Sequence, residues 1–315
     1  MTECKQCLIK EGTVLLWDFF AVSKEAYLDT DKKITKIVIN KDGLCNYCIT
    51  FNKNYDKAHI KNELSIFCFN SKKSEYHSIV ALSGGKDSIT ALYIAVVILK
   101  LKVIAVTYDN GFIPNKVIEQ SKRICDLLEV PYIVKKRTLY NEFKQEYKKD
   151  QDNIYQAITG IDFCQICSKY IYEAVFDVAR EYNIEKAIFG NKIYIELEPK
   201  VSCTKKVYIN KNEQIVEILK INLLFAMDIN TQIQQEILNS LSWENPKLKG
   251  YTSNCLIPSF VEFARQRKIN TKPDTGYIER ELRSGTYSIN EAKKLIQEHS
   301  YIDPSNEIDA FFEKI

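Results

Sequence analysis

Short apolar runs alternate with amphipathic stretches through the middle of the chain. Two of the amphipathic stretches, Ile89–Leu99 and Val117–Leu128, carry apolar residues at helical spacing, so they predict helices. The apolar runs are too short for helices and rich in β-branched residues, which predicts strands. The predicted strands are Ile79–Leu82, Val103–Tyr108, Tyr132–Lys135 and Lys186–Phe189. Strands that alternate with helices favour a Rossmann-like α/β fold, a parallel sheet with helices on both faces.

The chain beyond these strands predicts a hairpin followed by helices. Val207–Ile209 and Ile215–Leu219 flank a short polar turn, as the two strands of a β-hairpin do. Thr231–Leu241 has apolar residues at helical spacing. Ser288-Ile289-Asn290-Glu291 has the form of a capping box, which predicts that an amphipathic helix begins there.

The segment between the first predicted strand and helix is Ser83-Gly84-Gly85-Lys86-Asp87-Ser88. A Gly-Gly turn directly before a helix aims backbone N–H groups at one point, with the positive end of the helix dipole behind them. Ser83 and Ser88 add hydroxyl donors, Lys86 adds a positive charge, and Asp87 can orient the loop or a metal ion. The segment predicts a binding site for a nucleotide phosphate; a plain turn joining strand to helix is the alternative.

These six residues resemble the pyrophosphate loop of the PP-loop ATP pyrophosphatases, in the adenine nucleotide alpha-hydrolase-like superfamily. The resemblance is specific over about Ser78–Asn110. It implies a fold of the HUP/PP-loop type, and it implies that ATP is cleaved between its α and β phosphates. AMP is then placed on a carbonyl oxygen of the substrate, and a nitrogen or sulfur nucleophile displaces it. The resemblance also implies that ATP and Mg²⁺ are cofactors and that the nucleotide contacts Ser83, Gly84, Gly85, Lys86, Asp87 and Ser88.

Two further positions bear on this resemblance. Asp109 follows the second predicted strand, where open parallel sheets bind ligands, and the resemblance gives it contact with nucleotide or substrate. A turn residue before Gly111 is the alternative. The Gly-His-Asn-x-Asp-Asp run of the family, whose acids hold magnesium, is replaced here by Gly190-Asn191-Lys192-Ile193-Tyr194-Ile195-Glu196. Glu196 or Glu198 would then substitute for those acids, or ATP and Asp87 would hold the magnesium.

Composition restricts the setting but not the substrate. The 44 Lys and Arg against 41 Asp and Glu give a formal net charge of +3, too small to indicate nucleic acid. No apolar run reaches membrane-spanning length, and the start of the chain lacks a signal-peptide pattern, so we expect a cytoplasmic protein. Ten cysteines in such a protein indicate metal, cluster or redox chemistry rather than disulfides.

Two of the three C-x-x-C pairs lie in the N-terminal segment. Cys4-x-x-Cys7 and Cys45-x-x-Cys48 together predict a four-cysteine zinc site, with four unligated cysteines as the alternative. Four thiolates leave no open position for water, so the zinc would be structural, and residues 1–55 are predicted to form a zinc-binding module. The stretch Ile37–Cys48 is similar to the start of the N-acetyl sugar amidotransferases, a PP-loop group.

The third pair, Cys164-x-x-Cys167, precedes the helical stretch Lys169–Tyr182. We therefore expect both sulfurs near a helix N-terminus, which favours the thiolate. With Cys255 they resemble the three-cysteine arrangement of cluster-dependent PP-loop tRNA thiolases, which implies a [4Fe-4S] cluster with one open iron. Three alternatives stay open: a redox or persulfide pair, zinc with Cys203 as the fourth ligand, and buried inert thiols.

The domain prediction is completed by a nucleotide-binding domain over residues 74–200 and a mainly helical C-terminal substrate lobe over 201–315. Basic residues cluster in this lobe, where they predict phosphate contacts or a solvated helical face. They are Arg265, Arg267, Lys268, Lys272, Arg280 and Arg283.

The leading functional hypothesis is an ATP-dependent sulfur transferase that adenylates a carbonyl oxygen and replaces it with sulfur. Its catalytic residues would be Asp87, Cys164, Cys167 and Cys255. An amidotransferase that uses ammonia from a separate glutaminase is the alternative, and an ATP-binding sensor is a third interpretation. The expected partner is accordingly a sulfur donor or a glutaminase subunit, with homodimer formation a further option. The expected substrate is tRNA or a small carbonyl or amide compound.

Overall fold

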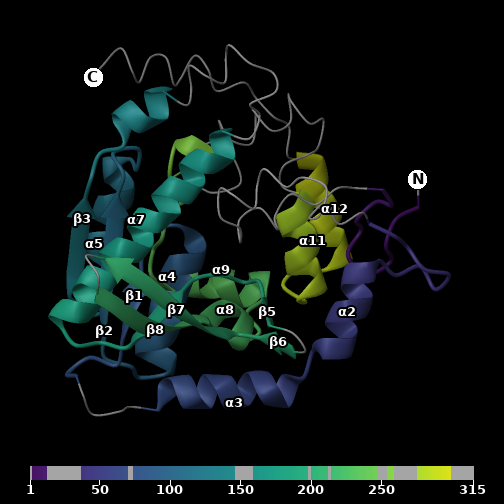
Figure 1. Ribbon diagram of the computed structural model, residues 1–315, viewed down its shortest axis with the longest axis horizontal. Helices are drawn as coiled ribbons and strands as arrows, with labels where there is room; N and C mark the ends of the chain where they lie inside the picture. Colours follow the sequence, from purple (N-terminus) through teal and green to yellow (C-terminus); the bar gives the residue numbers. More distant parts are fainter. Residues whose placement is uncertain are drawn as a thin grey trace.

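The chain folds around a six-stranded, mostly parallel sheet (Figure 1). The computed structural model describes residues 2–12, 37–69, 74–145, 159–197, 200–211, 214–246, 254–258 and 275–298. The strand order is β3-β2-β1-β4-β8-β7, in which β7 alone is antiparallel to its neighbour. The strands are β1 Ser78–Ala81, β2 Val103–Asp109, β3 Tyr132–Lys136, β4 Lys186–Phe189, β7 Thr204–Lys211 and β8 Gln214–Asn222. The predicted Rossmann-like α/β fold is confirmed.

Helices cover both faces of the sheet because successive strand residues point to opposite sides. On one face Val80 packs in a core with Leu92, Ile124 and Leu238 from the helices. The helices that contribute to this core include α3 Lys57–Cys68, α4 Lys86–Tyr93, α5 Asn115–Leu127, α8 Leu223–Ala226 and α9 Thr231–Ser240.

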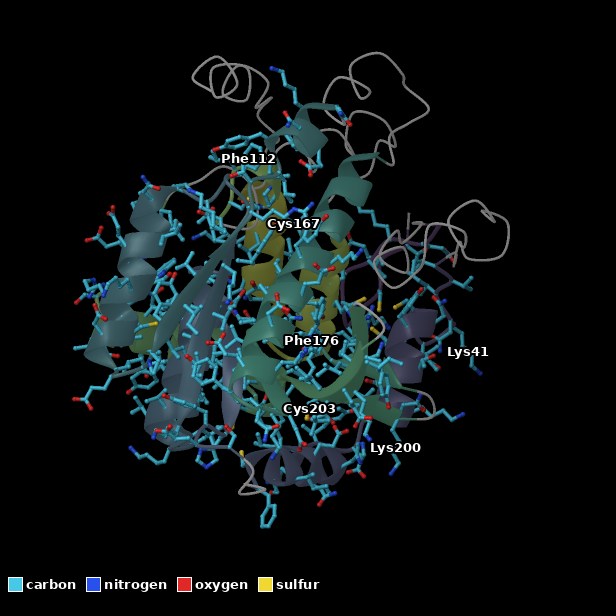
Figure 2. The ribbon with its side chains drawn as sticks, turned by 60° about the vertical axis from the view of Figure 1, so that its left-hand side comes forward. Lys41, Phe112, Cys167, Phe176, Lys200 and Cys203 are labelled. Atoms are coloured by element: carbon cyan, nitrogen blue, oxygen red, sulfur yellow. The ribbon has the colours of Figure 1, made fainter. Side chains whose placement is uncertain are left out.

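The opposite face is covered by the long helix α7, Thr159–Glu181. Its buried residues Val175 and Val178 pack with Ile79 and Ile104, the neighbours of the strand residues that face the first core. Figure 2 shows Phe176 and Cys167 at successive levels along this helix. The helix begins ten residues before the predicted Lys169, so Cys164 and Cys167 lie inside it and not at its N-terminus. That part of the prediction is wrong.

The predicted hairpin exists, but it is not part of a separate lobe. β8 pairs in parallel with β4 through Ile188 and Ile221, and β7 then forms the antiparallel edge of the same sheet. The sheet of the predicted nucleotide-binding domain therefore continues to Asn222. The predicted boundary at residue 201 does not separate this sheet from the hairpin. A second sheet has two antiparallel strands, β5 Ile195–Leu197 and β6 Lys200–Ser202. It lies in the sequence at the predicted boundary between residues 74–200 and 201–315.

The four-cysteine segment lies beside the C-terminal helices (Figure 1). Isolated bridges join Glu3 to Lys10 and Ile39 to Cys45, and α2, Asn46–Asn54, follows directly. The neighbouring helices are α11, Thr275–Arg283, and α12, Ile289–Glu298. The predicted capping box of α12 is confirmed: Ser288 N donates to Glu291 Oε2 (2.8 Å), and Glu291 N donates to Ser288 Oγ (3.2 Å).

Some predictions fall outside the described residues. These concern the segment between the two N-terminal cysteine pairs over residues 13–36, the position Glu198, and the basic residues Arg265, Arg267, Lys268 and Lys272. None of the helices in the described ranges is both long and apolar enough to cross a membrane.

Candidate active site

A cavity of about 480 Å³ opens at the carboxyl ends of β1, β2 and β4. The chain crosses from β1 to β2 and β3 on one side and later returns to β4 on the other side of β1. Ligands of open parallel sheets bind at such a switch point. The predicted loop, Ser83–Ser88, lines the cavity together with α7, the segment after β4 and the described loop 254–258.

At Gly84 the loop takes a left-handed backbone conformation that residues other than glycine rarely adopt. Its φ is +80°, and an added Cβ would lie 2.5 Å from Val117 Cγ1, so the turn packs tightly on α5. The hydroxyl oxygens of Ser83 and Ser88 lie 3.1 Å apart, and Ser88 Oγ also donates to Gly85 O (3.0 Å). Gly85 caps α4 without a side-chain hydrogen bond, which leaves the first N–H groups of the helix for a ligand.

Distant parts of the chain hold this loop in place. Trp243 Nε1 donates to Gly84 O (3.2 Å), and Asn254 Nδ2 donates to Ser83 O (3.2 Å). Gly190, directly after β4, lies so close to α4 that an added Cβ would be 2.6 Å from Ser88 N. These contacts fix the backbone of the loop from three separate parts of the chain.

Asp87 lies at the centre of an ionic network in which its own side chain and that of Lys86 are about one third exposed, whereas Lys192 is buried. Its Oδ1 atom accepts from Gln234 Nε2 (2.8 Å) and Lys86 Nζ (3.1 Å), and Lys192 Nζ lies 3.5 Å away. Burial raises the pKa of Asp87, but Lys86 and Lys192 outweigh burial and hold that pKa below its usual value. Burial lowers the pKa of Lys192, whereas Asp87 opposes that shift.

This network differs from the predicted role of Asp87 as a magnesium ligand. Two ammonium groups next to Asp87 oppose the approach of a divalent cation, so the structure favours Asp87 as an anchor for Lys86 and Lys192. Lys192 has no assigned role in the sequence prediction, although it stands inside the stretch where the family's acids are missing. The side chain of Glu196 lies outside the described residues.

A second carboxylate enters the network from α11. Glu281 is buried, and its Oε2 atom has no hydrogen-bond partner within the described part of the chain. Burial raises the pKa of Glu281, and the charge of nearby Asp87 adds to this rise. Burial and the neighbouring carboxylate therefore favour the neutral form of Glu281 beside the loop Ser83–Ser88.

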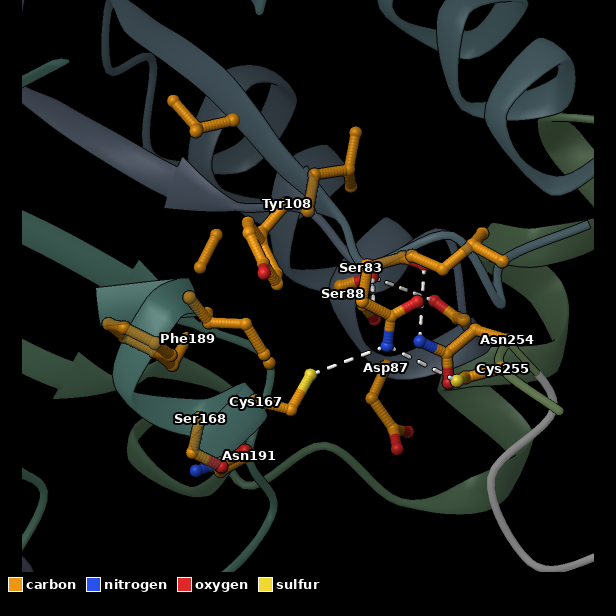
Figure 3. Close-up of a pocket in the computed structure, with 18 of the residues that line it drawn as sticks. Ser83, Asp87, Ser88, Tyr108, Cys167, Ser168, Phe189, Asn191, Asn254 and Cys255 are labelled. Carbon is orange, nitrogen blue, oxygen red and sulfur yellow. Dashed lines mark hydrogen bonds between the residues drawn. The ribbon is translucent and has the colours of Figure 1, made fainter. Parts of the chain in front are cut away.

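Two of the three candidate thiols meet in the cavity. Asn110 Nδ2 donates to Cys167 Sγ (3.3 Å) and to Cys255 Sγ (3.6 Å), so residues far apart in sequence share one amide (Figure 3). Burial raises the pKa of Cys167 to about 12, and burial also raises the pKa of Cys255. The expected preference for thiolate is therefore not observed for Cys167, because it lies within α7 and is buried. The Cys164 side chain lies outside the described residues.

At the end of β2, the side chain that faces the cavity is that of Asn110, directly after the strand, and not that of Asp109, its last residue. Side chains alternate along a strand, so Tyr108 and Asn110 face one side and Asp109 faces the other. Asp109 Oδ1 accepts from Gly111 N (2.9 Å), and Oδ2 lies 3.6 Å from Lys136 Nζ. The bond to Gly111 N fits the alternative interpretation of Asp109 as a turn residue. Asp109 is not among the residues that line the cavity.

The far side of the cavity is aromatic and basic. Lys220 of β8 donates from Nζ to Tyr172 OH (2.9 Å) and lies 4.5 Å from the ring centre of Phe189. All three residues line the cavity, so a cation on an aromatic wall faces the loop Ser83–Ser88. The sequence prediction assigns Lys220 no role because it places this strand in another domain.

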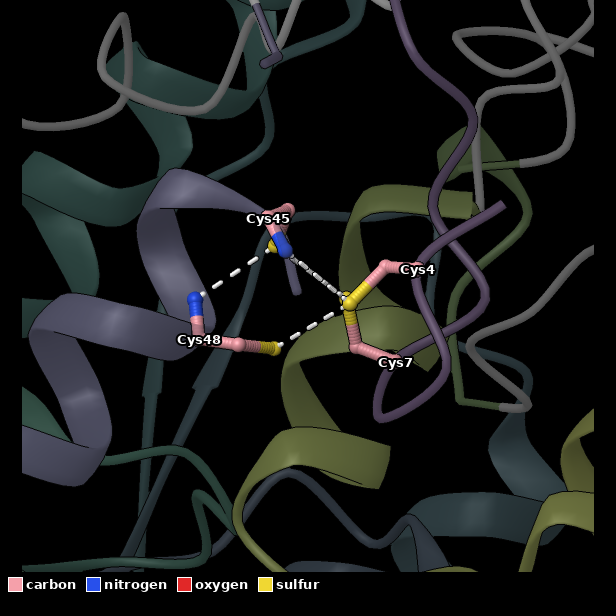
Figure 4. A group of neighbouring side chains, drawn as sticks. All are labelled: Cys4, Cys7, Cys45 and Cys48. Carbon is pink, nitrogen blue, oxygen red and sulfur yellow. Dashed lines mark hydrogen bonds between the residues drawn. The ribbon is translucent and has the colours of Figure 1, made fainter. Parts of the chain in front are cut away.

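The four N-terminal cysteines form a second, separate site (Figure 4). Their sulfur atoms are buried and lie within 4.8 Å of one another. The pairs Cys4–Cys48 and Cys7–Cys45 have sulfur–sulfur distances of 3.7 Å. A tetrahedral ion with metal–sulfur bonds of about 2.3 Å requires sulfur–sulfur distances of about 3.8 Å, so the four side chains fit such a metal ion. Cys45 N donates to Cys4 Sγ (3.3 Å) and supports the cluster.

Cys203 does not join the cavity thiols as a fourth ligand. Its sulfur donates to Ile60 O (3.7 Å) and packs in the core that contains α3, whereas Cys255 packs in the core on the other face of the sheet. The alternative of a zinc site that combines Cys203 with the cavity thiols is therefore wrong.

No family model matches the chain. An uncharacterized protein of Methanocaldococcus jannaschii is 29% identical over 230 residues, covering 71% of this chain and 75% of that protein. The structure of NMN synthetase from Francisella tularensis matches with 20% identity and a TM-score of 0.29, over 42% of this chain and 51% of that one. The match thus spans about half of that enzyme. The NH3-dependent NAD synthetase of Campylobacter jejuni subsp. jejuni, in complex with nitrate, matches with 14% identity and a TM-score of 0.36 over 73% and 95%.

The fold expected from the resemblance of Ser83–Ser88 is confirmed by the chain's own strand order and by the position of this loop between β1 and α4. At these identities and TM-scores the two solved structures assign no substrate and no reaction to this chain.

Proposed function

We propose that the protein is a PP-loop ATP pyrophosphatase that activates a carbonyl oxygen with AMP and replaces this oxygen with sulfur. The observation that carries the proposal is the shared cavity: the loop Ser83–Ser88 and the thiols of Cys167 and Cys255 line the same space. A phosphate cradle and two converging thiols are the two halves that such a reaction needs. The proposed nucleotide ligand is ATP with Mg²⁺, and the proposed ion of the four-cysteine site is zinc.

The first half-reaction uses the loop and the Lys86 cation that it carries. The substrate oxygen attacks the α-phosphorus of ATP, a new O–P bond forms, and pyrophosphate leaves as the bond to the β-phosphate oxygen breaks. Lys86 and the free N–H groups of α4 offset the charge that develops on the phosphates. Asp87 keeps Lys86 oriented, and the rigid contacts of Gly84 keep the cradle in position.

In the second half-reaction, Cys167 first attacks the outer sulfur of a persulfide donor, whose own thiolate leaves. The terminal sulfur of the resulting Cys167 persulfide then attacks the activated carbon, and AMP leaves with the original carbonyl oxygen. The Cys255 thiolate then attacks the Cys167 sulfur, which releases the thiolated product and leaves a Cys167–Cys255 disulfide. An external dithiol reduces this disulfide. Asn110 holds the two sulfurs next to each other for this exchange. We keep Cys164 in this proposal as a third thiol that takes part in sulfur transfer with Cys167 and Cys255.

The test supplies ATP and bulk tRNA with a ³⁵S-persulfide donor and measures AMP release and ³⁵S incorporation. We expect AMP release and ³⁵S incorporation in the wild-type protein. We expect no ³⁵S incorporation in Cys167→Ser, because the residue that accepts the persulfide sulfur is missing. Cys68→Ser, at a half-buried cysteine outside the cavity, is the matched control and retains both. Full incorporation of ³⁵S by Cys167→Ser would exclude a sulfur-carrier role for this residue. Iron and sulfide analysis after anaerobic purification shows whether these cysteines hold a cluster.

Amidotransfer is the second candidate, and the pKa of Cys167 favours it. A thiol whose pKa is raised to about 12 by burial remains protonated near neutral pH and is a poor nucleophile. Ammonia from a glutaminase partner would then displace AMP in the same cavity. AMP release that requires ammonium and proceeds equally in Cys167→Ser would identify this reaction. ATP binding without any pyrophosphate release, with tRNA and with small carbonyl compounds, would instead indicate a sensor.

A further inference from the structure

Arg283 joins the four-cysteine centre to the rest of the molecule. It ends α11 and is only 3% exposed. Its Nε donates to Cys48 Sγ (3.3 Å), and its Nη2 donates to Cys7 Sγ (3.6 Å). A buried guanidinium is stable only beside negative charge, and a divalent ion with four thiolates is an anion. These two bonds tie the buried guanidinium of Arg283 to the four-cysteine centre.

The same guanidinium also holds a segment that follows β4. Arg283 Nη1 donates to Tyr194 OH (2.8 Å), so one side chain bridges the cysteine cluster and Tyr194. Two further bonds come from α11 and the residue after it: Arg280 Nη2 donates to Tyr194 O, and Ser284 Oγ donates to Lys192 O, both at 3.4 Å. The backbone of residues 192–194 is therefore fixed from the side of the metal centre.

The other side of this segment contacts the phosphate loop. Lys192 is 3% exposed, and its Nζ donates a hydrogen bond to Gln234 Oε1 (2.7 Å). The same Nζ lies 3.5 Å from Asp87 Oδ1. Two residues earlier, the backbone of Gly190 packs directly against Asp87 and Ser88. A displacement of this segment would thus move both the cation and the backbone that shape the first turn of α4.

We propose that the four-cysteine centre positions the nucleotide site, in addition to stabilising the N-terminal segment around it. Arg283 and Tyr194 are the positioning residues: they fix Lys192, which in turn orients Asp87 in the loop Ser83–Ser88. This inference rests on the proposed binding of ATP at that loop. It predicts that nucleotide affinity depends on a hydrogen bond made far from the nucleotide, next to the metal centre.

The decisive variant is Tyr194→Phe, because it removes the bond from Arg283 and leaves every described contact of the guanidinium to sulfur in place. The measurement is titration calorimetry with Mg²⁺ and the non-hydrolysable ATP analogue AMPCPP, alongside metal content by mass spectrometry. We expect about tenfold weaker binding at unchanged metal stoichiometry. Arg283→Met should weaken binding more, and Arg283→Lys, which keeps the charge, should restore part of the loss.

Matched controls make the same chemical changes elsewhere. Tyr208→Phe lies on the exposed edge strand β7, and Arg180→Met lies on the exposed side of α7; both should bind AMPCPP as the wild-type protein does. Wild-type affinity in Tyr194→Phe would overturn the inference and leave the nucleotide site standing. A wild-type protein that binds no AMPCPP would instead overturn the proposed function itself, so the two failures are distinguishable.

Discussion

Gly190 shows how strongly the site depends on single positions. A Cβ at this residue would meet Ser88 N at 2.6 Å and the Asp87 carbonyl group at 2.7 Å, all of it backbone that cannot rotate away. We therefore expect Gly190→Ala to lower the free energy of unfolding by about 1–3 kcal/mol, as overpacking of a close contact does. Urea denaturation followed by circular dichroism measures this change.

Gly85→Ala is the matched control for that variant. Its added Cβ would lie 3.6 Å from Asn254, an ordinary van der Waals contact, so we expect only the smaller loss that comes from alanine being a poorer N-cap than glycine. Equal stability of Gly190→Ala and Gly85→Ala would contradict the close packing of the segment after β4 against α4.

The buried thiol of Cys167 predicts a pH dependence. Burial raises its pKa from 9.0 to about 12, and only the thiolate is alkylated, so the reactive fraction at pH 8 is about one in ten thousand. Because the pKa lies above the measured range, the rate of alkylation by iodoacetamide should rise about tenfold per pH unit between pH 8 and 10. Mass spectrometry of the Cys167 peptide from iron-free protein measures this rate.

The guanidinium-denatured chain is the control for Cys167. There the thiol regains its ordinary pKa, so we expect faster alkylation and a rate that levels off above pH 9. A rate in the folded protein that is independent of pH would show a thiolate at Cys167 and would contradict a raised pKa.

Several site residues could be predicted one by one, and others could not. Ser83–Ser88 carries its chemistry in a contiguous run, and the two N-terminal C-x-x-C pairs carry theirs in their spacing. Asn110 and Lys192 lack such a signal, because their roles arise from strand phase and from contacts with Cys255 and Asp87, which are distant in sequence. Strand alternation was the signal that could have separated Asn110 from Asp109.

At the scale of elements, α12 offers a direct test of a local rule. Ser288 is exposed, so its value to stability comes from the cap and not from burial. Ser288→Ala removes the hydrogen bond to Glu291 N and should cost about 1 kcal/mol of unfolding free energy. Thermal denaturation compares it with Lys293→Ala, an exposed change within the same helix that we expect to be nearly neutral. Equal losses in the two variants would contradict a stabilising cap.

Element boundaries were harder to predict than element types. The helix predicted from Ile89 begins earlier, at Lys86, because Gly85 serves as its N-cap, and it ends in the π-helical turn Ile94–Ile98 before Lys100 at φ 54°. The helix predicted from Lys169 begins at Thr159, a start that the pattern does not predict because the sequence before Lys169 carries no capping signal that would mark it. That shift changes the chemistry expected of Cys167, because a helix interior lacks the positive end of the dipole.

At the scale of the molecule, strand pairing decided what spacing could not. The hairpin after residue 200 has the local pattern of any hairpin, and its pairing with β4 depends on contacts across the whole domain. The pairing brings Lys220 to the cavity, so one wall of the site comes from a region that the sequence assigned to another domain. Likewise, α11 connects the four-cysteine cluster to Tyr194, in the segment after β4, through tertiary contacts alone.

Because the cavity is lined by β1, β2, β4, α7 and the described loop 254–258, a ligand there binds only the fully folded molecule. AMPCPP with Mg²⁺ at about one hundred times its Kd should therefore stabilise the wild-type protein by about 2.7 kcal/mol, which is several degrees in Tm. Lys86→Met removes the charge that faces the phosphates and should lose most of this shift. Lys122→Met, on the exposed side of α5, should keep it. Equal shifts in the two variants, measured by differential scanning calorimetry, would place the nucleotide away from Ser83–Ser88.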